Sequence, residues 1–391
     1  MTPRMARADR NGAVRSAATS WRQAEAIDDR TLAAIEAAYP DERQGVGPVF
    51  RVLLFLFALI SIGGAFGFVS ALGGSSWSTG FVPMLLLFFG AGLIIATDFQ
   101  VTLMLRARGG VEAATSLAGI VFLAVFVFWI CDKDGWKDDH AFAAMLLVAA
   151  ILLAGAAWRW GYPLYAGAAM AAFLGSFVAF PGARLVWIAV PLLVAPVLTR
   201  LAESPRLPPS HRDSCAFALG VALAGLYTAV HLGSLDSRLL EDWHYGKLPS
   251  SAIFRGLAIA ATALVPVIYL AIGLRSRRYV FLLLGLGTGV ASLVTLRYYV
   301  HLAPLWVILT LSGAALVAAV LVLRRYLDSG PGKERHGYTA EPLFEEMGRR
   351  RMLEAGAAVV SLSPEARPVH EEPKFAGGGG SFGGGGASGE F

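Results

Sequence analysis

Charged side chains are scarce in this sequence, and one long stretch has none. Asp, Glu, Lys and Arg make up 16% of the 391 residues. The 46 residues between Arg51 and Asp98 contain no Asp, Glu, Lys, Arg or His. A bilayer core requires about 20 apolar residues per helix, so this stretch is long enough for two crossings and too apolar for a water-soluble domain. A polar turn at 73–80 divides it, which predicts a hairpin of two membrane spans.

Cysteine is also rare, and the sequence lacks familiar catalytic motifs. Cys131 and Cys215 are the two cysteines, and the topology predicted below places them near opposite membrane faces, too far apart for a disulfide. The first forty residues hold no apolar segment, so we expect no cleaved signal peptide. We find no H-E-x-x-H spacing, Walker loop, nucleophile elbow or kinase motif, and therefore assign no catalytic residue, no metal site and no cofactor.

Apolar windows predict an all-α, polytopic transmembrane helical bundle. Hydrophobic residues make up 56% of the chain, a composition typical of membrane proteins. We count about ten spans. They lie at approximately 49–72, 81–103, 113–131, 140–158, 162–180, 183–200, 214–235, 252–274, 279–299 and 303–326. The fifth and sixth are separated by four residues, 181–184, so a re-entrant pair is an alternative there.

The distribution of basic residues predicts that both termini are cytosolic. Eight arginines occur from Arg4 to Arg51, and nine Lys and Arg residues follow from Arg324 to Lys374, and such residues favour the cytosolic side of bacterial membranes. We therefore divide the chain into a cytosolic N-terminal tail (1–48), a bundle (49–326) and a cytosolic C-terminal tail (327–391). The formal charge of +5 lies mainly in the tails and at span ends, which favours anionic lipid over nucleic acid as the partner.

Both tails contain recognisable segments. In the N-terminal tail we predict a short helix pair, one helix around Trp21 and a second that begins with Asp28 or Asp29 as its N-cap and ends before Pro40. In the C-terminal tail, apolar residues at 343–347 beside three arginines at 349–351 indicate an interfacial segment. The final residues, from about 376, are too rich in glycine to order themselves.

These tail segments carry two resemblances. The sequence WRQAEAIDDRTLAAIEAAYPDE, followed at once by an apolar span, resembles bacterial membrane proteins that begin with a short cytosolic Trp-bearing helix pair, a family without an assigned activity. The ending FGGGGASGEF is similar to the tails of some membrane proteins that carry a TPM domain, although no TPM domain is visible here. The resemblance implies residence in the bacterial cytoplasmic membrane and transfers no site residue.

Ionisable residues near span ends form the candidate anion-binding site. They are Arg297, Tyr298 and His301 around the end of the ninth span, His231 late in the seventh, and Arg255 early in the eighth. All map toward the outer face, where a guanidinium and two imidazoles would suit a phosphate or carboxylate. The alternative is that the arginines extend to the lipid interface and that His231 bonds a neighbouring helix.

Other polar or small residues have structural interpretations. Asp98 suits a proton path, but Arg106 and Arg108 nearby favour a cytosolic extension of the second span. Acids and His140 at 132–140, and a second acidic group at 236–244, suggest metal by residue type but lack ligand spacing. Glycines within spans predict close helix packing, and they occur at Gly63, Gly64, Gly67, Gly285, Gly287 and Gly289.

We weighed three functions. The first is a non-enzymatic membrane accessory or scaffold protein that binds the bilayer and recruits a protein partner through its tails. The second is a transporter of a small or anionic solute, in which Pro191, Pro196, Pro266 and Pro304 would mark broken helices. The third is a lipid-linked transferase at the outer face. Because few charges lie within the spans, the sequence favours the first.

Overall fold

The computed structural model describes most of the chain before residue 340. The described residues are 1–23, 25–40, 46–72, 81–105, 109–178, 180, 182–233, 252–276, 278–300, 305–329, 334–335 and 338–339. The chain divides into two compact units, Met1–Glu341 and Pro342–Phe391. The predicted interfacial segment and the glycine-rich tail belong to the second unit and lie outside the described residues. His301 belongs to the first unit and also lies outside the described residues.

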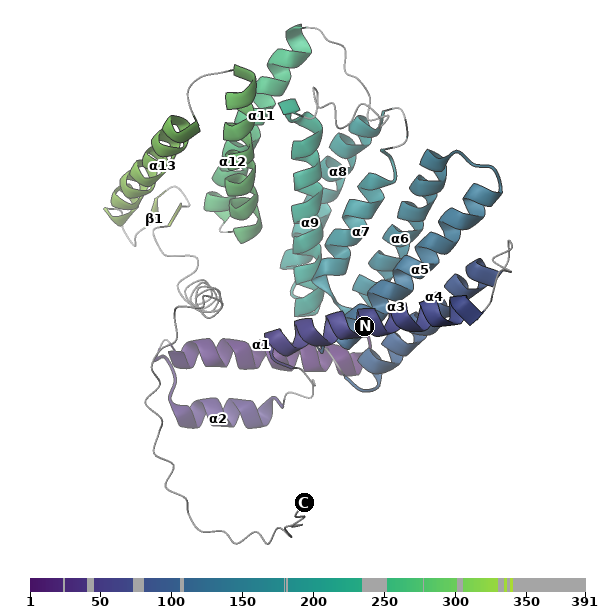
Figure 1. The fold of residues 1–391 in the computed structure, drawn as a ribbon. Helices are drawn as coiled ribbons and strands as arrows, with labels where there is room; N and C mark the ends of the chain where they lie inside the picture. The colour runs from purple at the N-terminus through teal and green to yellow at the C-terminus, as the bar shows by residue number, and fades with distance from the viewer. Residues whose placement is uncertain are drawn as a thin grey trace, which may run out of the picture. The chain divides into compact units, whose positions relative to one another are not determined.

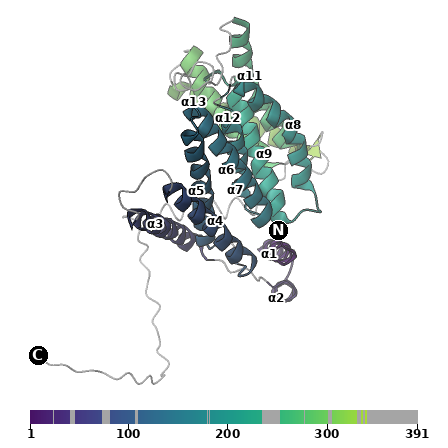
Figure 2. The same cartoon turned by 90° about the vertical axis from the view of Figure 1, so that its right-hand side faces the viewer.

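The described part is helical apart from two short strands (Figures 1 and 2). The helices are α1 Pro3–Gln23, α2 Asp29–Ala38, α3 Pro48–Leu72, α4 Phe81–Thr102, α5 Val111–Lys133, α6 Asp138–Trp160, α7 Pro163–Gly175, α8 Ala183–Glu203, α9 Pro209–Val230, α11 Ala252–Ser276, α12 Tyr279–Val300 and α13 Leu305–Asp328. The strands β1 Glu334–Arg335 and β2 Tyr338–Thr339 pair antiparallel, with Glu334 opposite Thr339.

Among the described residues, eight helices are long and apolar enough to cross a membrane. They are α3, α4, α5, α6, α8, α9, α11 and α12, and they identify a multi-pass membrane protein. The two other predicted spans correspond to α7 and α13. At 13 residues, α7 extends about 20 Å, less than the roughly 30 Å of a bilayer core. The count of ten therefore stays a prediction.

The short helix α7 is joined to the start of α8 by a side chain. Trp187 donates a hydrogen bond from its indole nitrogen to the Leu174 carbonyl oxygen at 2.7 Å, which satisfies an acceptor at the end of α7. The helix α8 then continues through Pro191 and Pro196, and α11 continues through Pro266. These three prolines do not break their helices, contrary to what the transporter hypothesis predicted. Pro304 lies outside the described residues.

Most neighbours in the bundle are neighbours in sequence. The main pairs are α4 with α5, α5 with α6, α6 with α7, α8 with α9, and α11 with α12, while α9 also packs against α7 and α12. Large apolar side chains on the remaining faces point outward, including Ile60 (73% exposed) and Leu193 (72% exposed). Such exposure suits a lipid environment, in which an apolar outer face is stable.

Two glycines show why these helices approach closely. A Cβ added to Gly90 in α4 would lie 2.7 Å from Cγ of Leu123 and 3.1 Å from the Gly119 carbonyl oxygen in α5. Gly110, before α5, has a φ of 97°, and an added Cβ would overlap the Arg51 carbonyl oxygen of α3. Glycine is required at Gly110 both for its backbone conformation and for this contact.

The N-terminal helices α1 and α2 form a pair. Arg15 donates to the Glu36 carbonyl oxygen at 3.0 Å, and Arg22 forms an ion pair with Asp29 at 2.5 Å. Asp28 is the N-cap of α2 and accepts from the Thr31 backbone nitrogen at 2.8 Å, as predicted. Hydrogen bonds from Thr31 lower the pKa of the Asp28 carboxyl. The cap is therefore fully formed at pH values above the ordinary pKa of Asp, and it is lost as the pH falls through the lowered pKa of the folded state.

Candidate functional site

Helix α1 is fixed to one end of the bundle, which we call the α1 end. The Ser210 backbone nitrogen at the start of α9 donates to Oδ2 of Asp9 at 2.9 Å, and Asp9 is 7% exposed. Met5 is buried in a core cluster with Val101 of α4 and Trp160 of α6. In Figure 1, α1 lies across the region where α6 ends and α9 begins. The N-terminal segment is therefore packed on the bundle as well as on α2.

An ion pair joins α4 to α6 beside this contact. Both oxygens of the Asp98 carboxylate accept from Arg159, at 2.8 and 3.0 Å, and the Trp160 indole donates to the same carboxylate at 3.0 Å. The sequence suggested Arg106 and Arg108 as its neighbours, and these lie outside the described residues. A bidentate Arg–carboxylate pair fixes geometry, so Asp98 holds the ends of two spans together.

A histidine completes the contacts of the α1 end. Nε2 of His211 lies 2.9 Å from the Trp158 carbonyl oxygen, and the two rings meet edge to face at 5.3 Å. A carbonyl can only accept, so the proton belongs on Nε2. His211 therefore ties the first turn of α9 to the last turn of α6.

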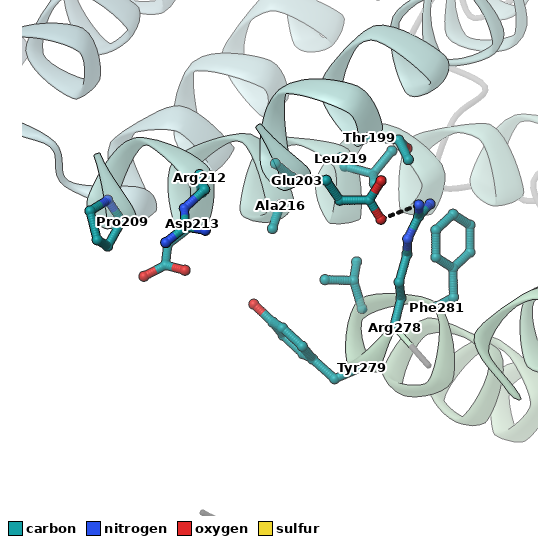
Figure 3. Close-up of a pocket in the computed structure, with 12 residues that line it drawn as sticks. Thr199, Glu203, Pro209, Arg212, Asp213, Ala216, Leu219, Arg278, Tyr279 and Phe281 are labelled. Carbon is teal, nitrogen blue, oxygen red and sulfur yellow. Dashed lines mark hydrogen bonds and ion pairs between the residues drawn. The ribbon is translucent and has the colours of Figure 1, made fainter. Parts of the chain in front are cut away.

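The same end contains a pocket of about 280 Å³ between α8, α9 and α12 (Figure 3). Its polar lining includes Glu203, Arg212, Asp213, Arg278 and Tyr279. The apolar lining consists of Ala202, Ala216, Leu219, Val280 and Phe281, with Thr199 and Pro209 at the edges. The pocket combines charged groups with an apolar floor, so its chemistry suits an amphiphile.

The two arginines of this pocket differ in their partners. Arg278 forms an ion pair with Glu203, drawn as the dashed line in Figure 3. The Arg212 guanidinium makes no hydrogen bond or ion pair with any residue that the structure describes, and its Nε atom is buried. Neither arginine is among the site residues predicted from the sequence. The available signal was the mixture of Arg, Glu and Asp around the connection between α8 and α9, together with the arginines between α11 and α12. Only the packing of α8, α9 and α12 brings these residues together.

The predicted outer cluster lies at the opposite end, where α9 and α12 end and α11 begins. His231 is the C-cap residue of α9, and its ring centroid lies 4.9 Å from that of Tyr227. A Cβ added to Gly233 would lie 3.6 Å from Cγ2 of Thr295, which places the end of α9 beside the last turns of α12. The structure therefore brings the helix ends that carry His231 and Arg297 together.

The other predicted residues of this cluster are more peripheral. Tyr298 is 73% exposed, with its ring against that of Tyr299. Arg255 in the first turns of α11 is exposed, whereas Arg297 is half-buried. None of these residues lines the pocket at the α1 end.

Buried polar groups below His231 connect three helices. The Tyr227 hydroxyl lies 2.8 Å from Oγ of Ser292, and Ser292 donates to the Thr262 carbonyl oxygen at 2.5 Å. Oγ1 of Thr262 accepts from the Leu232 backbone nitrogen at 2.8 Å. These groups satisfy one another, and hydrogen bonds of this kind stabilise helix association in membranes.

A second cavity, of about 730 Å³, is found where α5 and α7 end and α6 begins. The His140 ring stacks on Phe180 with centroids 5.3 Å apart, and Trp136 and Lys137 also line the cavity. Among the described residues, no group of three or more His, Cys, Asp or Glu side chains could hold a metal ion. The second predicted acidic group, at 236–244, lies outside the described part.

The contacts at the α1 end therefore join α1, α4, α6 and α9 through polar side chains. No protein-family model, curated protein or solved structure matches this chain.

Proposed function

We propose that this chain is a non-enzymatic accessory or scaffold protein of the bacterial cytoplasmic membrane, in which the α1–α2 pair recruits a protein partner. One observation carries the proposal: α1 is held on the bundle through the buried carboxylate of Asp9. A helix fixed in this way presents its outer surface in one orientation, and preorganisation lowers the entropic cost of binding.

Two aromatic side chains on the pair supply contact sites. Trp21 is 49% exposed and Tyr39 is 42% exposed, although α1 buries other side chains, including Met5 and Ala8. Trp and Tyr are enriched among residues that dominate protein interfaces. We therefore assign the partner contact to the two aromatic ends of this pair.

The recruitment test is crosslinking in native membranes. A photoreactive residue at position 36 should give a discrete protein adduct, and the combined Trp21→Ala and Tyr39→Ala variant should reduce that adduct at least ten-fold because both anchors are lost. Trp136→Ala is the matched control, since Trp136 is 51% exposed at the other end of the bundle. An adduct of equal yield in all variants, or lipid adducts alone, would refute recruitment by this surface.

The proposal includes an orientation with ten spans and both termini in the cytosol, which places the α1 end on the cytosolic side. In a variant lacking Cys131 and Cys215, a cysteine at Asp134 should react with an impermeant maleimide in intact spheroplasts. A cysteine at Arg206 should react only after permeabilisation. Asp134 and Arg206 are both exposed, so a difference in labelling between the two positions reports the side of the membrane on which each one lies. Reversed labelling would invert the topology.

Transport of an anionic solute is the second candidate function. The unpartnered Arg212 in the pocket at the α1 end favours it, because this cation is available to an anion. The continuity of α8 and α11 through their prolines argues against the broken-helix form of this hypothesis.

A further inference from the structure

The Arg212 guanidinium stands out because a charged donor group lies in a pocket wall without a protein acceptor. Its Nε atom is buried and has no hydrogen-bond partner, and no described residue forms an ion pair with it. The residue as a whole is half-buried, and an anion in the pocket would supply the acceptor that its buried Nε lacks.

Arg278, the residue immediately before α12, lines the facing wall of the pocket. One of its terminal nitrogens donates to Glu203, while its Nε is buried without a hydrogen-bond partner. Figure 3 shows Arg278 and Glu203 on one side of the pocket and Arg212 on the other. A ligand between them would meet two guanidinium groups, one of which is already balanced by Glu203.

The surrounding charge favours an anion. Glu203 and Asp213 are the acids that line the pocket, and Glu203 is committed to Arg278. Three further arginines on adjoining segments are exposed: Arg200 in the last turn of α8, Arg206 in the connection between α8 and α9, and Arg275 in the last turn of α11. The two arginines and two acids of the lining balance in formal charge, and the three exposed arginines nearby add positive charge that attracts anions electrostatically.

The form of the pocket narrows the class of ligand. Guanidinium groups match phosphate oxygens in bidentate geometry. The floor contains Leu219, Val280 and Phe281, which suit an apolar group next to the phosphate. At about 280 Å³, the pocket is near the lower limit for small-molecule sites, which fits a headgroup and the carbons adjoining it.

We propose that this pocket binds the phosphate group of a phosphate ester, with Arg212 as its principal ligand. The phosphate reaches the pocket from one of two sources, a phospholipid headgroup in the adjacent leaflet or a soluble phosphate ester. The apolar floor serves acyl or glycerol carbons in either case. The site is separate from the α1–α2 surface and does not depend on recruitment of a protein.

The test uses the purified full-length chain in detergent, delipidated and titrated separately with dioleoylphosphatidylglycerol and with glycerol 3-phosphate. Binding is measured by native mass spectrometry, with dioleoylglycerol as the probe that lacks phosphate. Arg212→Gln should weaken binding of the phosphate probe about ten- to a hundred-fold, because charge-assisted hydrogen bonds are lost. Arg206→Gln is the matched control, since Arg206 is exposed near the pocket but does not line it.

The outcomes distinguish the two sources of phosphate from each other and also test whether the pocket binds phosphate. Binding of phosphatidylglycerol alone identifies a lipid site, and binding of glycerol 3-phosphate identifies a soluble ligand and supports transport. Arg212→Gln should keep the wild-type melting temperature without ligand, since Arg212 has no described protein partner to lose. Equal affinity of wild type and Arg212→Gln for both phosphate probes, or equal binding of dioleoylglycerol, overturns the proposal.

Discussion

Replacing Gly285 with alanine should force α11 and α12 apart and lower the melting temperature of the protein in detergent. A Cβ at Gly285 would lie 2.6 Å from Cγ of Leu270 and 2.8 Å from the Leu270 backbone nitrogen. The side chain can rotate away, but the backbone can move only with its helix. Overpacking of this kind costs about 1–3 kcal/mol.

Gly287 provides the matched control on the same helix. A Cβ added there meets nothing within 4 Å, and alanine favours a helix over glycine by roughly 0.5–1 kcal/mol. Gly287→Ala should therefore keep or slightly raise the melting temperature. Gly273→Ala should behave like Gly285→Ala, because its Cβ would lie 2.9 Å from the Leu282 backbone nitrogen. Equal stability of the variants at 285 and 287 would contradict the packing of these two helices.

Replacing Asp9 with alanine should release α1 from the bundle. The buried carboxylate accepts a hydrogen bond from the Ser210 backbone nitrogen at 2.9 Å, and a hydrogen bond to a charged group contributes about 1.5–3 kcal/mol. The population of undocked α1 should therefore rise roughly ten- to a hundred-fold. The measurement is the rate of tryptic cleavage after Arg7 and Arg10, which requires the helix to open locally.

Asp29→Ala is the control for this prediction. Asp29 also forms an ion pair within the N-terminal pair, with Arg22, but its side chain is 81% exposed. Exposed pairs contribute little because water screens them. We expect Asp29→Ala to be cleaved at the wild-type rate and Asp9→Ala to be cleaved faster. That result would show that the Asp9 contact stabilises the docking of α1 on the bundle. Unchanged cleavage of Asp9→Ala would show that other contacts, such as the burial of Met5, are enough to hold α1 on the bundle.

The glycines illustrate which packing details the sequence could predict. The sequence suggested close helix contacts at glycines in the first and ninth predicted spans. The structure supports this at Gly285, but a Cβ at Gly63, Gly64 or Gly67 would meet nothing within 4 Å. Helical periodicity places a glycine on a face, whereas only the arrangement of neighbouring helices determines whether another helix covers that face.

The ionisable residues show the same limit. The sequence grouped five residues by their common end of the bundle, and the structure places four of them at that end: His231, Arg255, Arg297 and Tyr298. The fifth, His301, lies outside the described residues. The exposure of Arg255 and Tyr298 could not be predicted, because it depends on how α11 and α12 rotate against their neighbours. Asp98 was assigned to a helix extension, yet its partner Arg159 lies 61 residues away in sequence.

The sequence by itself determined that this is a multi-pass helical membrane protein, because long uncharged runs have few stable alternatives to membrane-spanning helices. It also narrowed the N-cap of α2 to Asp28 or Asp29, since capping depends on residues close in the chain. Tertiary structure alone decided that Asp9 meets Ser210 and that Arg212 and Arg278 share a pocket. Those groups are distant in sequence, and their meeting depends on helix packing that local patterns do not encode.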